Sequence, residues 1–421
     1  MFQFSKDLQD LSARALDRVQ GMFRQIDDVT EYNQKKVLEA FINNKVSEAM
    51  FVATTGYGHS DWGRETLERV FADALDAEDA LVRHNFTCGT HTLAVALFGV
   101  LRPGDTMLCV SGTPYDTIQP VIGITEEAPD TGSLKDFGVQ YDEVALNKNG
   151  KLDYDAIEAK IRAAQPKMVY LQRSRGYSLR DTLSIDEIER VVKIAKSCSN
   201  AIVMVDNCYG EFTEKKEPTT VGADLIAGSM IKNPGGGIAK TGGYIAGRAD
   251  LIEKCANRFS TPGLGKEIGA TLGMTRDMFL GIFQSPHIVG EALKTACYTA
   301  AVFESLGFAT TPRSDETRHD IIQAICLENK ENLIAFCRGL QLGSPIDSFV
   351  VPEPSAMPGY DCDVIMAGGS FTNGSTIELS ADAPLREPYA VWFQGSLNFH
   401  SAKPAVLCAA KAVLDLQKKE G

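Results

Sequence analysis

The sequence lacks the long apolar run of about 18 residues that a membrane-spanning helix requires. Basic residues are also in deficit, because 42 Lys and Arg face 55 Asp and Glu and the formal net charge is −13 at pH 7. Such a chain is a poor general ligand for nucleic acid or an anionic membrane. The first residues mix charged and apolar side chains and form no signal-peptide core. We therefore expect a cytoplasmic protein with neither nucleic acid nor membrane among its partners.

Spacing patterns typical of metal sites and disulfide frameworks are missing as well. The ten Cys form no CxxC pair, and the six His show neither HxxxH nor HExxH spacing. In a chain of this length, scattered cysteines are mostly small buried apolar residues. The sequence therefore predicts no metal site.

Two glycine-rich segments fail as nucleotide-binding motifs. Segment 232–243 has Pro234 and Ala239 at the two positions where a Walker A motif requires glycine. Segment 263–269, GLGKEIG, is one residue too long for the dinucleotide fingerprint and follows no predicted strand. These departures argue against a nucleotide-binding α/β protein, but that class of protein stays an alternative.

Short apolar runs alternate with amphipathic helical stretches from about residue 50 to residue 275. One predicted helix opens with Ser184 and Glu187, which form a capping box. Strands that alternate with helices favour a largely parallel sheet covered on both faces. The predicted strands cover 80–86, 106–112, 167–172 and 201–207, and the predicted helices cover 64–75, 154–164 and 185–197.

The pattern changes after about residue 285. Helices are predicted at 289–305 and near 329–340, and the chain ends in a helix over 403–419. Strand-like segments lie between them at 364–371, 375–381 and 389–397. The sequence thus predicts three regions: an N-terminal helical segment (1–45), a large α/β domain (46–285) and a smaller α+β C-terminal domain (286–421).

Asp206 and Lys232 form the most informative pair of residues. Asp206 ends the most hydrophobic predicted strand, and ligands of open α/β sheets bind at such strand ends. Lys232 ends the apolar run 224–232, three residues after Ser229, and glycines follow it. Because burial lowers the pKa of a lysine and frees its amine, Lys232 is a candidate nucleophile. The alternatives are a snorkelling lysine and a capping aspartate.

Segment 206–237, DNCYGEFTEKKEPTTVGADLIAGSMIKNPGGG, resembles the coenzyme-binding segment of the fold-type I, pyridoxal-phosphate-dependent enzymes of cysteine and methionine metabolism. The motifs TTGYGHSDWGRETLE, SGTPYDT, QRSRGYSLR and SADAPLREPYAVWFQGSL are similar to the methionine gamma-lyase-like, or "aluminium resistance", subgroup. The resemblance covers about residues 45 to 400. It implies an α/β fold of the PLP-dependent transferase type, with a mostly parallel large-domain sheet and a smaller α+β C-terminal domain.

The resemblance also implies roles for individual residues. Lys232 would bind pyridoxal 5'-phosphate and move the Cα proton, while Asp206 would face the pyridine nitrogen. Tyr115 would stack on the pyridine ring and donate a proton to the leaving sulfur. The phosphate would be held by the start of a helix and by a hydroxyl group: Cys88, Gly89, Thr90 and Ser229.

Further contacts in the family come from a neighbouring subunit, so the resemblance implies a homodimer or homotetramer with shared active sites. A Tyr-x-Arg pair of the wider family reaches the phosphate across that interface. Here Tyr57 is present, but position 59 is His, and Arg64 is the candidate substitute.

The wider family places an Asn near the phenolic oxygen of the coenzyme, whereas this chain has Gln-Arg-Ser-Arg-Gly-Tyr at 172–177. Which group replaces that Asn stays open. For the substrate carboxylate, the candidate clamp is Arg386, and Arg175 is its rival.

The function implied is a PLP-dependent carbon–sulfur lyase acting on a sulfur amino acid, in the manner of a cystathionine beta-lyase or a methionine gamma-lyase. The first steps of β- and γ-elimination are the same, so the sequence does not separate them. The alternatives are an aminotransferase or a γ-replacement synthase of the same fold, and a non-catalytic scaffold.

Overall fold

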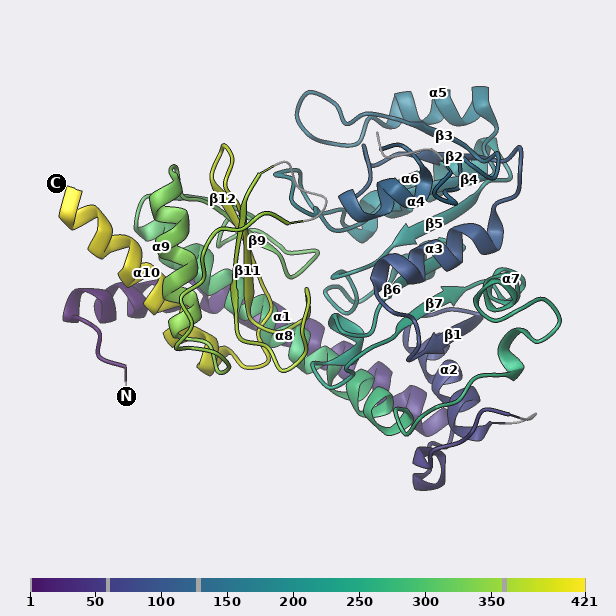
Figure 1. Ribbon diagram of the computed structural model, residues 1–421, viewed down its shortest axis with the longest axis horizontal. Helices are drawn as coiled ribbons and strands as arrows, with labels where there is room; N and C mark the ends of the chain where they lie inside the picture. Colours follow the sequence, from purple (N-terminus) through teal and green to yellow (C-terminus); the bar gives the residue numbers. More distant parts are fainter. Residues whose placement is uncertain (1, 58–60, 126–129, 358–361, 421) are drawn as a thin grey trace. The chain divides into compact units, whose positions relative to one another are not determined.

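The computed structural model describes residues 2–57, 61–125, 130–357 and 362–420 (Figure 1). It divides into two compact units, Asn33–Gln284 and Met1–Tyr32 with Ser285–Gly421. Two long helices, α1 (Lys6–Asn43) and α8 (Thr275–Ser305), contribute residues to both units. The three regions predicted from the sequence, with limits at 45 and 285, remain a proposal.

A seven-stranded sheet with the order β1-β7-β6-β5-β4-β2-β3 forms the centre of the unit Asn33–Gln284. Neighbouring strands from β3 to β6 are parallel, and β7 is antiparallel to both of its neighbours. This mostly parallel sheet confirms the predicted fold class. The strands are β1 (Asp79–Arg83), β2 (Thr106–Cys109), β3 (Gln140–Glu143), β4 (Met168–Gln172), β5 (Ile202–Asp206), β6 (Leu225–Ser229) and β7 (Gly243–Gly247).

Helices cover both faces of this sheet, as successive residues of β7 show. The ring of Tyr244 lies 5.9 Å from that of Phe71 in α2, whereas Ile245 belongs to the apolar cluster of α3 and α7. The predicted capping box of Ser184 and Glu187 is confirmed at the start of α6. The helices are α2 (Trp62–Ala74), α3 (Gly89–Val100), α4 (Gln119–Ile122), α5 (Tyr154–Ala164), α6 (Ile185–Cys198) and α7 (Ala249–Phe259), with 3-10 helices η1 (Glu48–Phe51), η2 (Asp116–Ile118), η3 (Pro218–Val221), η4 (Asn233–Gly235) and η5 (Gly265–Glu267).

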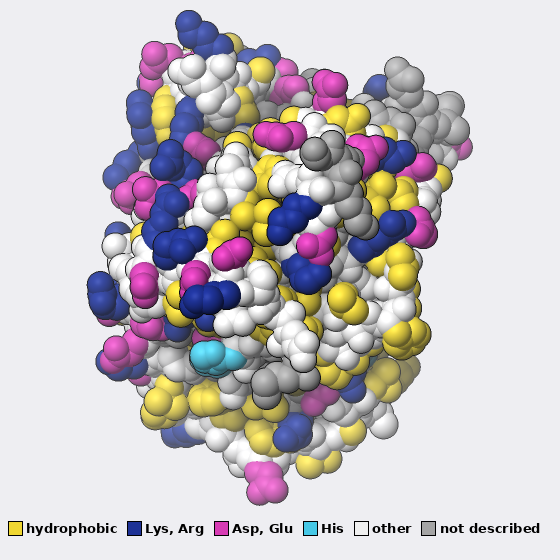
Figure 2. Space-filling view, turned by 90° about the vertical axis from the view of Figure 1, so that its left-hand side faces the viewer, with side chains coloured by type: hydrophobic (Ala, Val, Ile, Leu, Met, Phe, Trp, Pro, Cys, Tyr) yellow, Lys and Arg dark blue, Asp and Glu magenta, His cyan; other side chains and the backbone are white. Residues whose placement is uncertain are grey.

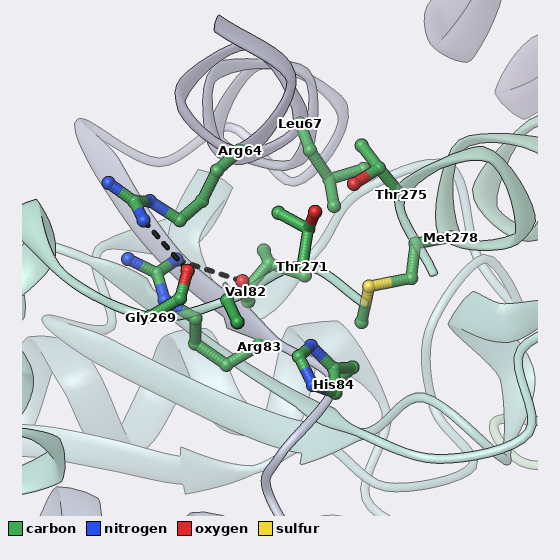
Figure 3. Close-up of a pocket in the computed structure, with 10 residues that line it drawn as sticks. Arg64, Leu67, Val82, Arg83, His84, Gly269, Thr271, Thr275 and Met278 are labelled. Carbon is green, nitrogen blue, oxygen red and sulfur yellow. Dashed lines mark hydrogen bonds between the residues drawn. The ribbon is translucent and has the colours of Figure 1, made fainter. Parts of the chain in front are cut away.

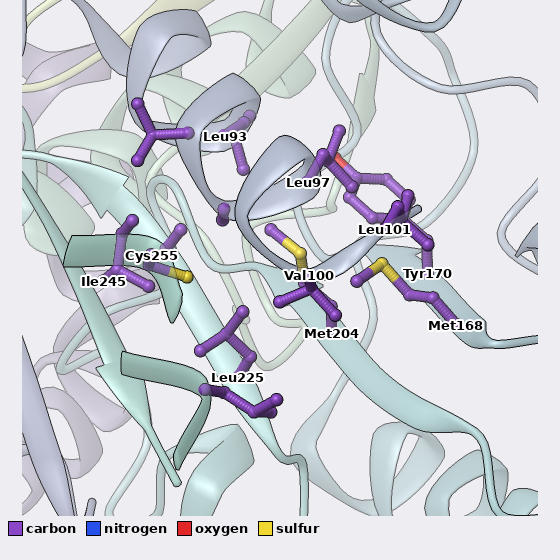
Figure 4. Packing of buried hydrophobic residues seen from close by; sticks show 14 of the residues in the cluster. Leu93, Leu97, Val100, Leu101, Met168, Tyr170, Met204, Leu225, Ile245 and Cys255 are labelled. Atoms are coloured by element: carbon purple, nitrogen blue, oxygen red, sulfur yellow. The ribbon is translucent and has the colours of Figure 1, made fainter. Parts of the chain in front are cut away.

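An apolar core lies between the sheet and helices α3 and α7. Apolar side chains of α3 face side chains from the middle strands, and none of those named here is more than 5% exposed (Figure 4). Burying each large aliphatic side chain stabilises the fold by about 1.5–3 kcal/mol. This packing fixes the strand ends. Members of the core include Leu93, Leu97, Val100, Met168, Tyr170, Met204, Leu225 and Ile245.

The unit that contains the C-terminus is built on a second, five-stranded sheet, which is antiparallel throughout, with the order β10-β11-β12-β9-β8. Helices α9 and α10 pack so closely that a Cβ on Gly339 would lie 2.6 Å from Ala409 Cα. The elements are β8 (Ala309–Thr311), β9 (Gln323–Cys326), α9 (Lys330–Leu342), β10 (Val364–Gly368), β11 (Ser380–Pro384), β12 (Ala390–Gln394) and α10 (Phe399–Glu420).

One strand of this sheet begins later than the sequence suggests. The segment 375–381 was expected to be a strand, yet β11 starts only at Ser380. The polar side chains of the segment bond locally instead, because Glu378 accepts from the N–H of Phe371 at 2.8 Å and Thr376 Oγ1 accepts from Glu378 N at 3.0 Å. Such side-chain-to-backbone bonds compete with a strand ladder.

None of the described helices combines the length and apolar character needed to span a bilayer. Lys and Arg are interspersed with Asp and Glu on the face shown in Figure 2. No continuous field of one charge sign therefore covers that face.

Candidate active site

Asp206 ends β5 at the carboxyl edge of the parallel strands, where the sequence placed it. Its side chain is 7% exposed, and Oδ1 accepts a hydrogen bond from Cys208 N at 3.1 Å. Burial raises the pKa of this carboxyl, and the charge of Lys232 opposes that rise. The two groups therefore interact electrostatically, as a carboxylate and an amine of one site must.

Lys232 follows β6, and its backbone N–H donates to Ser229 O at 3.2 Å. Its side chain is partly buried, and Nζ lies 4.1 Å from the centre of the Tyr209 ring. Burial disfavours the ammonium form, but Cys208, Tyr209 and Asp206 outweigh burial and raise the pKa of Lys232. The expectation of a lowered lysine pKa is therefore wrong for the protein alone, because an acidic neighbourhood surrounds the amine.

Tyr209 is a site residue that the sequence analysis did not single out. Its ring is 8% exposed and its backbone has φ +69°, a left-handed conformation that is uncommon for a residue with a side chain. The turn is closed by Gly210 N, which donates to Asn207 O at 2.8 Å. The only signal in the sequence was a Tyr-Gly step directly after a buried strand.

Ser229 ends β6 and is fully buried, yet its Oγ has no hydrogen-bond partner among the described residues. A Cβ on Gly89 would lie 3.4 Å from Ser229 Cβ and 3.8 Å from Cys208 Sγ. The start of α3 therefore lies directly beside this hydroxyl. A buried hydroxyl without a partner beside a helix N-terminus fits a phosphate group.

The remaining predicted phosphate residues also lie at the start of α3. Cys88 is the N-cap, and its Sγ accepts from His91 N at 3.4 Å. Thr90 Oγ1 lies 2.7 Å from Thr117 Oγ1, which joins the helix start to the segment that carries Tyr115. The structure therefore brings Gly89, Thr90 and Ser229 together with the Tyr115 segment.

A buried network of charges holds the loop that follows Asp206. The fully buried guanidinium of Arg173 donates to Asn207 Oδ1 at 2.9 Å and to Gly210 O at 2.8 Å. It also pairs with Glu214 at 2.8 Å and with Glu217 at 3.6 Å. The loop conformation that places Tyr209 thus depends on the residue directly after β4, which the sequence analysis treated as part of an unexplained segment.

Glu211 is a second buried carboxyl near the site. Its Oε1 accepts from Tyr244 Oη at 2.8 Å, while its Oε2 has no partner in the described part of the chain. Desolvation raises the pKa of Glu211 to about 8, although Tyr244 and Lys232 both oppose the rise. Glu211 is thus held mainly in its neutral form near pH 7.

Arg64 lies in a small cavity, about 20 Å³ in volume, beside Arg83 and Gly269 (Figure 3). It is 3% exposed and its Nη1 donates to Gly269 O at 3.0 Å. Nε and Nη2 have no partner among the residues described. Burial and the charge of Arg83 lower the pKa of Arg64. The phosphate role expected for Arg64 across a subunit interface stays a prediction.

The other predicted residues are spread over the chain. Tyr57 is 87% exposed, and His59 lies outside the described residues. Arg175 is 2% exposed, and its Nε donates to Thr182 Oγ1 at 3.5 Å. Arg386 is exposed in the turn between β11 and β12, in the other unit. No group of three or more His, Cys, Asp or Glu suited to a metal ion occurs within the described ranges.

Known proteins with similar sequences and structures point to the same family as the sequence motifs. A family model for methionine gamma-lyase matches residues 8–414. The chain belongs to the methionine gamma-lyase family. This membership confirms the resemblance that the sequence motifs indicated.

Within this family, the chain is 49% identical to a solved structure from Clostridium novyi NT, described as a carbon-sulfur lyase involved in aluminium resistance. The two match with a TM-score of 0.92 over 96% of this chain and 95% of the other. It is also 46% identical over 400 residues to YnbB of Bacillus subtilis (strain 168), an uncharacterised protein, covering 95% of this chain and 94% of YnbB.

More distant structures support the fold alone. The pyridoxal-5'-phosphate-dependent protein YhfS of Escherichia coli matches with a TM-score of 0.64 at 16% identity, over 93% of this chain and 97% of YhfS. The fold is therefore that of the fold-type I pyridoxal-phosphate enzymes, as the sequence predicted.

Proposed function

We propose that the protein is a pyridoxal-phosphate-dependent carbon–sulfur lyase that acts on a sulfur amino acid. One observation carries this proposal: the amine of Lys232, the carboxyl of Asp206 and the unpartnered hydroxyl of Ser229 gather at one edge of the sheet. The similarity to a carbon-sulfur lyase that is 49% identical supports it.

The residues present suit pyridoxal 5'-phosphate. Ser229 Oγ and the backbone N–H groups of Gly89 and Thr90 would hold its phosphate, because they lie together at a helix start. Asp206 would hold a proton on the ring nitrogen, and Lys232 would bind the aldehyde carbon. When bound, the coenzyme supplies a ring that accepts electron density from the substrate Cα.

The protein's own groups would carry the protons of the reaction. Lys232 Nζ would take the proton from the substrate Cα and return it later. Asp206 would stay ionised, since the proton it faces belongs to the ring nitrogen. Tyr115, which lies near enough to Lys232 to influence its pKa, would donate a proton to the leaving sulfur.

The substrate carboxylate would be bound by an arginine, because a guanidinium pairs with a carboxylate through two parallel bonds. Arg386 is exposed, whereas Arg175 is 2% exposed. We therefore keep Arg386 as the first candidate and Arg175 as its rival.

A second copy of the chain would complete the site, as a homodimer or within a homotetramer. Large apolar side chains are exposed on the segment that carries Tyr57 and on the loop that pairs with it, at Val52 (67%), Trp62 (69%) and Leu272 (72%). The two segments are joined by a bond from Thr271 N to Thr54 O, 3.4 Å. Such an exposed apolar surface is typical of an interface.

Product analysis tests the proposed function. The purified protein would be incubated with L-cystathionine, L-cysteine and L-methionine, and the thiol and the 2-oxo acid measured. Pyruvate from cystathionine would indicate β-elimination, and 2-oxobutanoate from methionine would indicate γ-elimination. Amino transfer to an added 2-oxo acid without thiol release would contradict the lyase and favour the aminotransferase.

A lysine variant provides the matched control. Lys232→Ala should abolish both turnover and borohydride fixation of the coenzyme to the protein. Lys240→Ala should do neither, because Lys240 lies in the same loop with its side chain 72% exposed. Borohydride fixation that survives in Lys232→Ala would show that another amine binds the coenzyme.

A further inference from the structure

Gln172 ends β4 and is only 7% exposed. Its main-chain and side-chain polar groups all form hydrogen bonds. Its backbone N–H donates to Ser111 Oγ at 2.9 Å, and its carbonyl accepts from Arg180 Nη2 at 2.8 Å. Its side-chain Oε1 accepts from Tyr115 N at 2.6 Å, and Nε2 donates to Ser174 O at 2.9 Å. One residue thus joins the end of β4 to two segments, 111–115 and 174–180, at the carboxyl edge of the sheet.

The orientation of this amide is fixed by its partners. An N–H group needs an acceptor and a carbonyl needs a donor, so Oε1 must face Tyr115 and Nε2 must face Ser174. Gln172 is also the register partner of Asp206 on the neighbouring parallel strand. The amide therefore connects the end of β4, the strand beside that of Asp206, to the backbone of Tyr115.

The loop 174–180, which follows Gln172, packs against the ring of Tyr115. Gly176 has φ +59°, and a Cβ there would lie 2.9 Å from Tyr115 Cδ2. The ring of Tyr177 lies 5.8 Å from the ring of Tyr115. Because Ser174 O accepts from both Gln172 and Arg180, the amide and the loop behind the ring are held as one piece.

We propose that Gln172 is a positioning residue, which sets the orientation of the Tyr115 ring in the active site. It acts at two points, the backbone of Tyr115 and the loop against which the ring packs. The inference rests on the proposed function, in which Tyr115 stacks on the coenzyme and donates the proton to sulfur.

The holoenzyme with Gln172→Met provides the first test. Methionine keeps the length and volume of glutamine and removes both side-chain hydrogen bonds. We expect coenzyme affinity to fall about tenfold, since two neutral hydrogen bonds are lost. The circular dichroism of the coenzyme's visible band, per bound coenzyme, should also fall, because it reports the surroundings of the ring. Wild-type affinity and dichroism in this variant would overturn the proposal.

A double variant separates positioning from general stabilisation. If Gln172 acts through the ring of Tyr115, adding Gln172→Met to Tyr115→Ala should weaken coenzyme binding no further. Additive losses would show that the amide acts by another route and would overturn the proposal. Gln172→Glu keeps the acceptor for Tyr115 N–H and loses the donor to Ser174, so its affinity should lie between those of wild type and Gln172→Met.

Gln341→Met is the matched control. The amide of Gln341 is 4% exposed and also bridges two backbone groups, accepting from Gly368 N at 2.8 Å and donating to Asp347 O at 3.0 Å. The Gln341→Met variant should lower the melting temperature much as Gln172→Met does, and it should leave coenzyme affinity and dichroism unchanged. Equal losses of affinity in both variants would overturn the proposal.

Gly176→Ala serves if Gln172→Met does not fold. It keeps the Gln172 side chain and places a Cβ 2.9 Å from Tyr115 Cδ2, so the ring must shift and the visible dichroism should change. Unchanged dichroism would overturn the proposal. A wild-type protein that binds no coenzyme would instead contradict the proposed function, and the positioning role would fall with it.

Discussion

The ammonium nitrogen of Lys232 lies 4.1 Å from the centre of the Tyr209 ring. A cation at this distance from an aromatic face is stabilised by about 0.5–2 kcal/mol. The ring is held in place by a left-handed backbone at Tyr209 and by the contacts of Arg173 to the following residue. The charge of the lysine is therefore influenced by the aromatic ring of Tyr209 as well as by nearby acidic groups.

Replacing Tyr209 with leucine should lower the pKa of Lys232 by about one unit, because the aromatic face that favours the ammonium form is removed. Tyr209→Phe keeps the ring and loses only the phenolic hydroxyl, so the pKa of Lys232 should fall less than in Tyr209→Leu. The pH dependence of the reaction of Lys232 with an aldehyde reagent, in protein freed of coenzyme, would measure the shift. Identical pH profiles for Tyr209→Leu and wild type would show that the ring does not influence the amine.

Removing the hydroxyl of Ser229 should weaken coenzyme binding about tenfold and change the free energy of unfolding by less than about 0.5 kcal/mol. The reason is that Ser229 Oγ has no partner among the described residues, so the fold loses no hydrogen bond in Ser229→Ala. Equilibrium dialysis and denaturant unfolding would measure the two quantities.

Ser12→Ala should give the opposite result. Ser12 Oγ lies 2.7 Å from Tyr298 Oη, and both residues belong to the unit that does not contain Ser229, so the loss of this hydrogen bond should cost about 1 kcal/mol of stability and leave coenzyme affinity unchanged. A loss of stability without a loss of affinity in Ser229→Ala would remove the phosphate role of that hydroxyl.

Glu211 should make the stability of the protein depend on pH. Burial raises its pKa from 4.5 to about 8, so between these values the folded protein holds a proton that the unfolded chain has released. The stability contributed by this group is complete below about pH 4.5 and is lost as the pH rises through about 8. Glu211→Gln cannot lose that proton.

The variant Glu211→Gln should therefore become more stable relative to wild type as the pH rises from 5 to 8.5. Denaturant unfolding at several pH values would measure the difference, and Glu158→Gln on the exposed face of α5 would serve as control. A constant difference between Glu211→Gln and wild type across this range would show that Glu211 does not change its charge there.

Arg173→Met, which removes the guanidinium, should destabilise the protein by about 3–5 kcal/mol. The reason is that Glu217 would be left as a buried carboxyl without its cation. Arg162→Met breaks an exposed pair with Glu158, at 2.6 Å, and should cost less than about 0.5 kcal/mol. Urea unfolding would compare the two variants. Equal losses would mean that the buried network contributes no more than a surface pair.

Sequence patterns were most informative where one residue type dominates a short segment. The apolar run 201–207 predicted β5 because its residues suit a strand that is buried on both faces. Segment 375–381 alternates apolar with polar residues, as a half-buried strand does, yet the hydrogen bonds of Glu378 and Thr376 to nearby backbone N–H groups delay β11 until Ser380. Hydrophobicity alone does not include that competition.

The residues of the site also divide into those that the sequence pattern predicts and those that it does not. Asp206, Lys232 and Ser229 could be predicted because they lie in one segment whose order and spacing are specific. Gln172 and Glu211 could not, since each gains its position from partners that only folding brings near. Gln172 reaches Tyr115, 57 residues away, and Glu211 reaches Tyr244, 33 residues away.

The antiparallel course of β7 beside β6 has a consequence for motion. The connection that carries Lys232 leaves one buried strand and returns along its neighbour, and it is closed by a bond from Met230 N to Gly242 O at 2.9 Å. Its interior is so crowded that a Cβ on Gly235 would lie 1.7 Å from Met230 O. The main chain at Lys232 is therefore held in one conformation. Any movement of the amine from one reacting atom to the next must come from rotation about the bonds of the four methylene groups of the lysine.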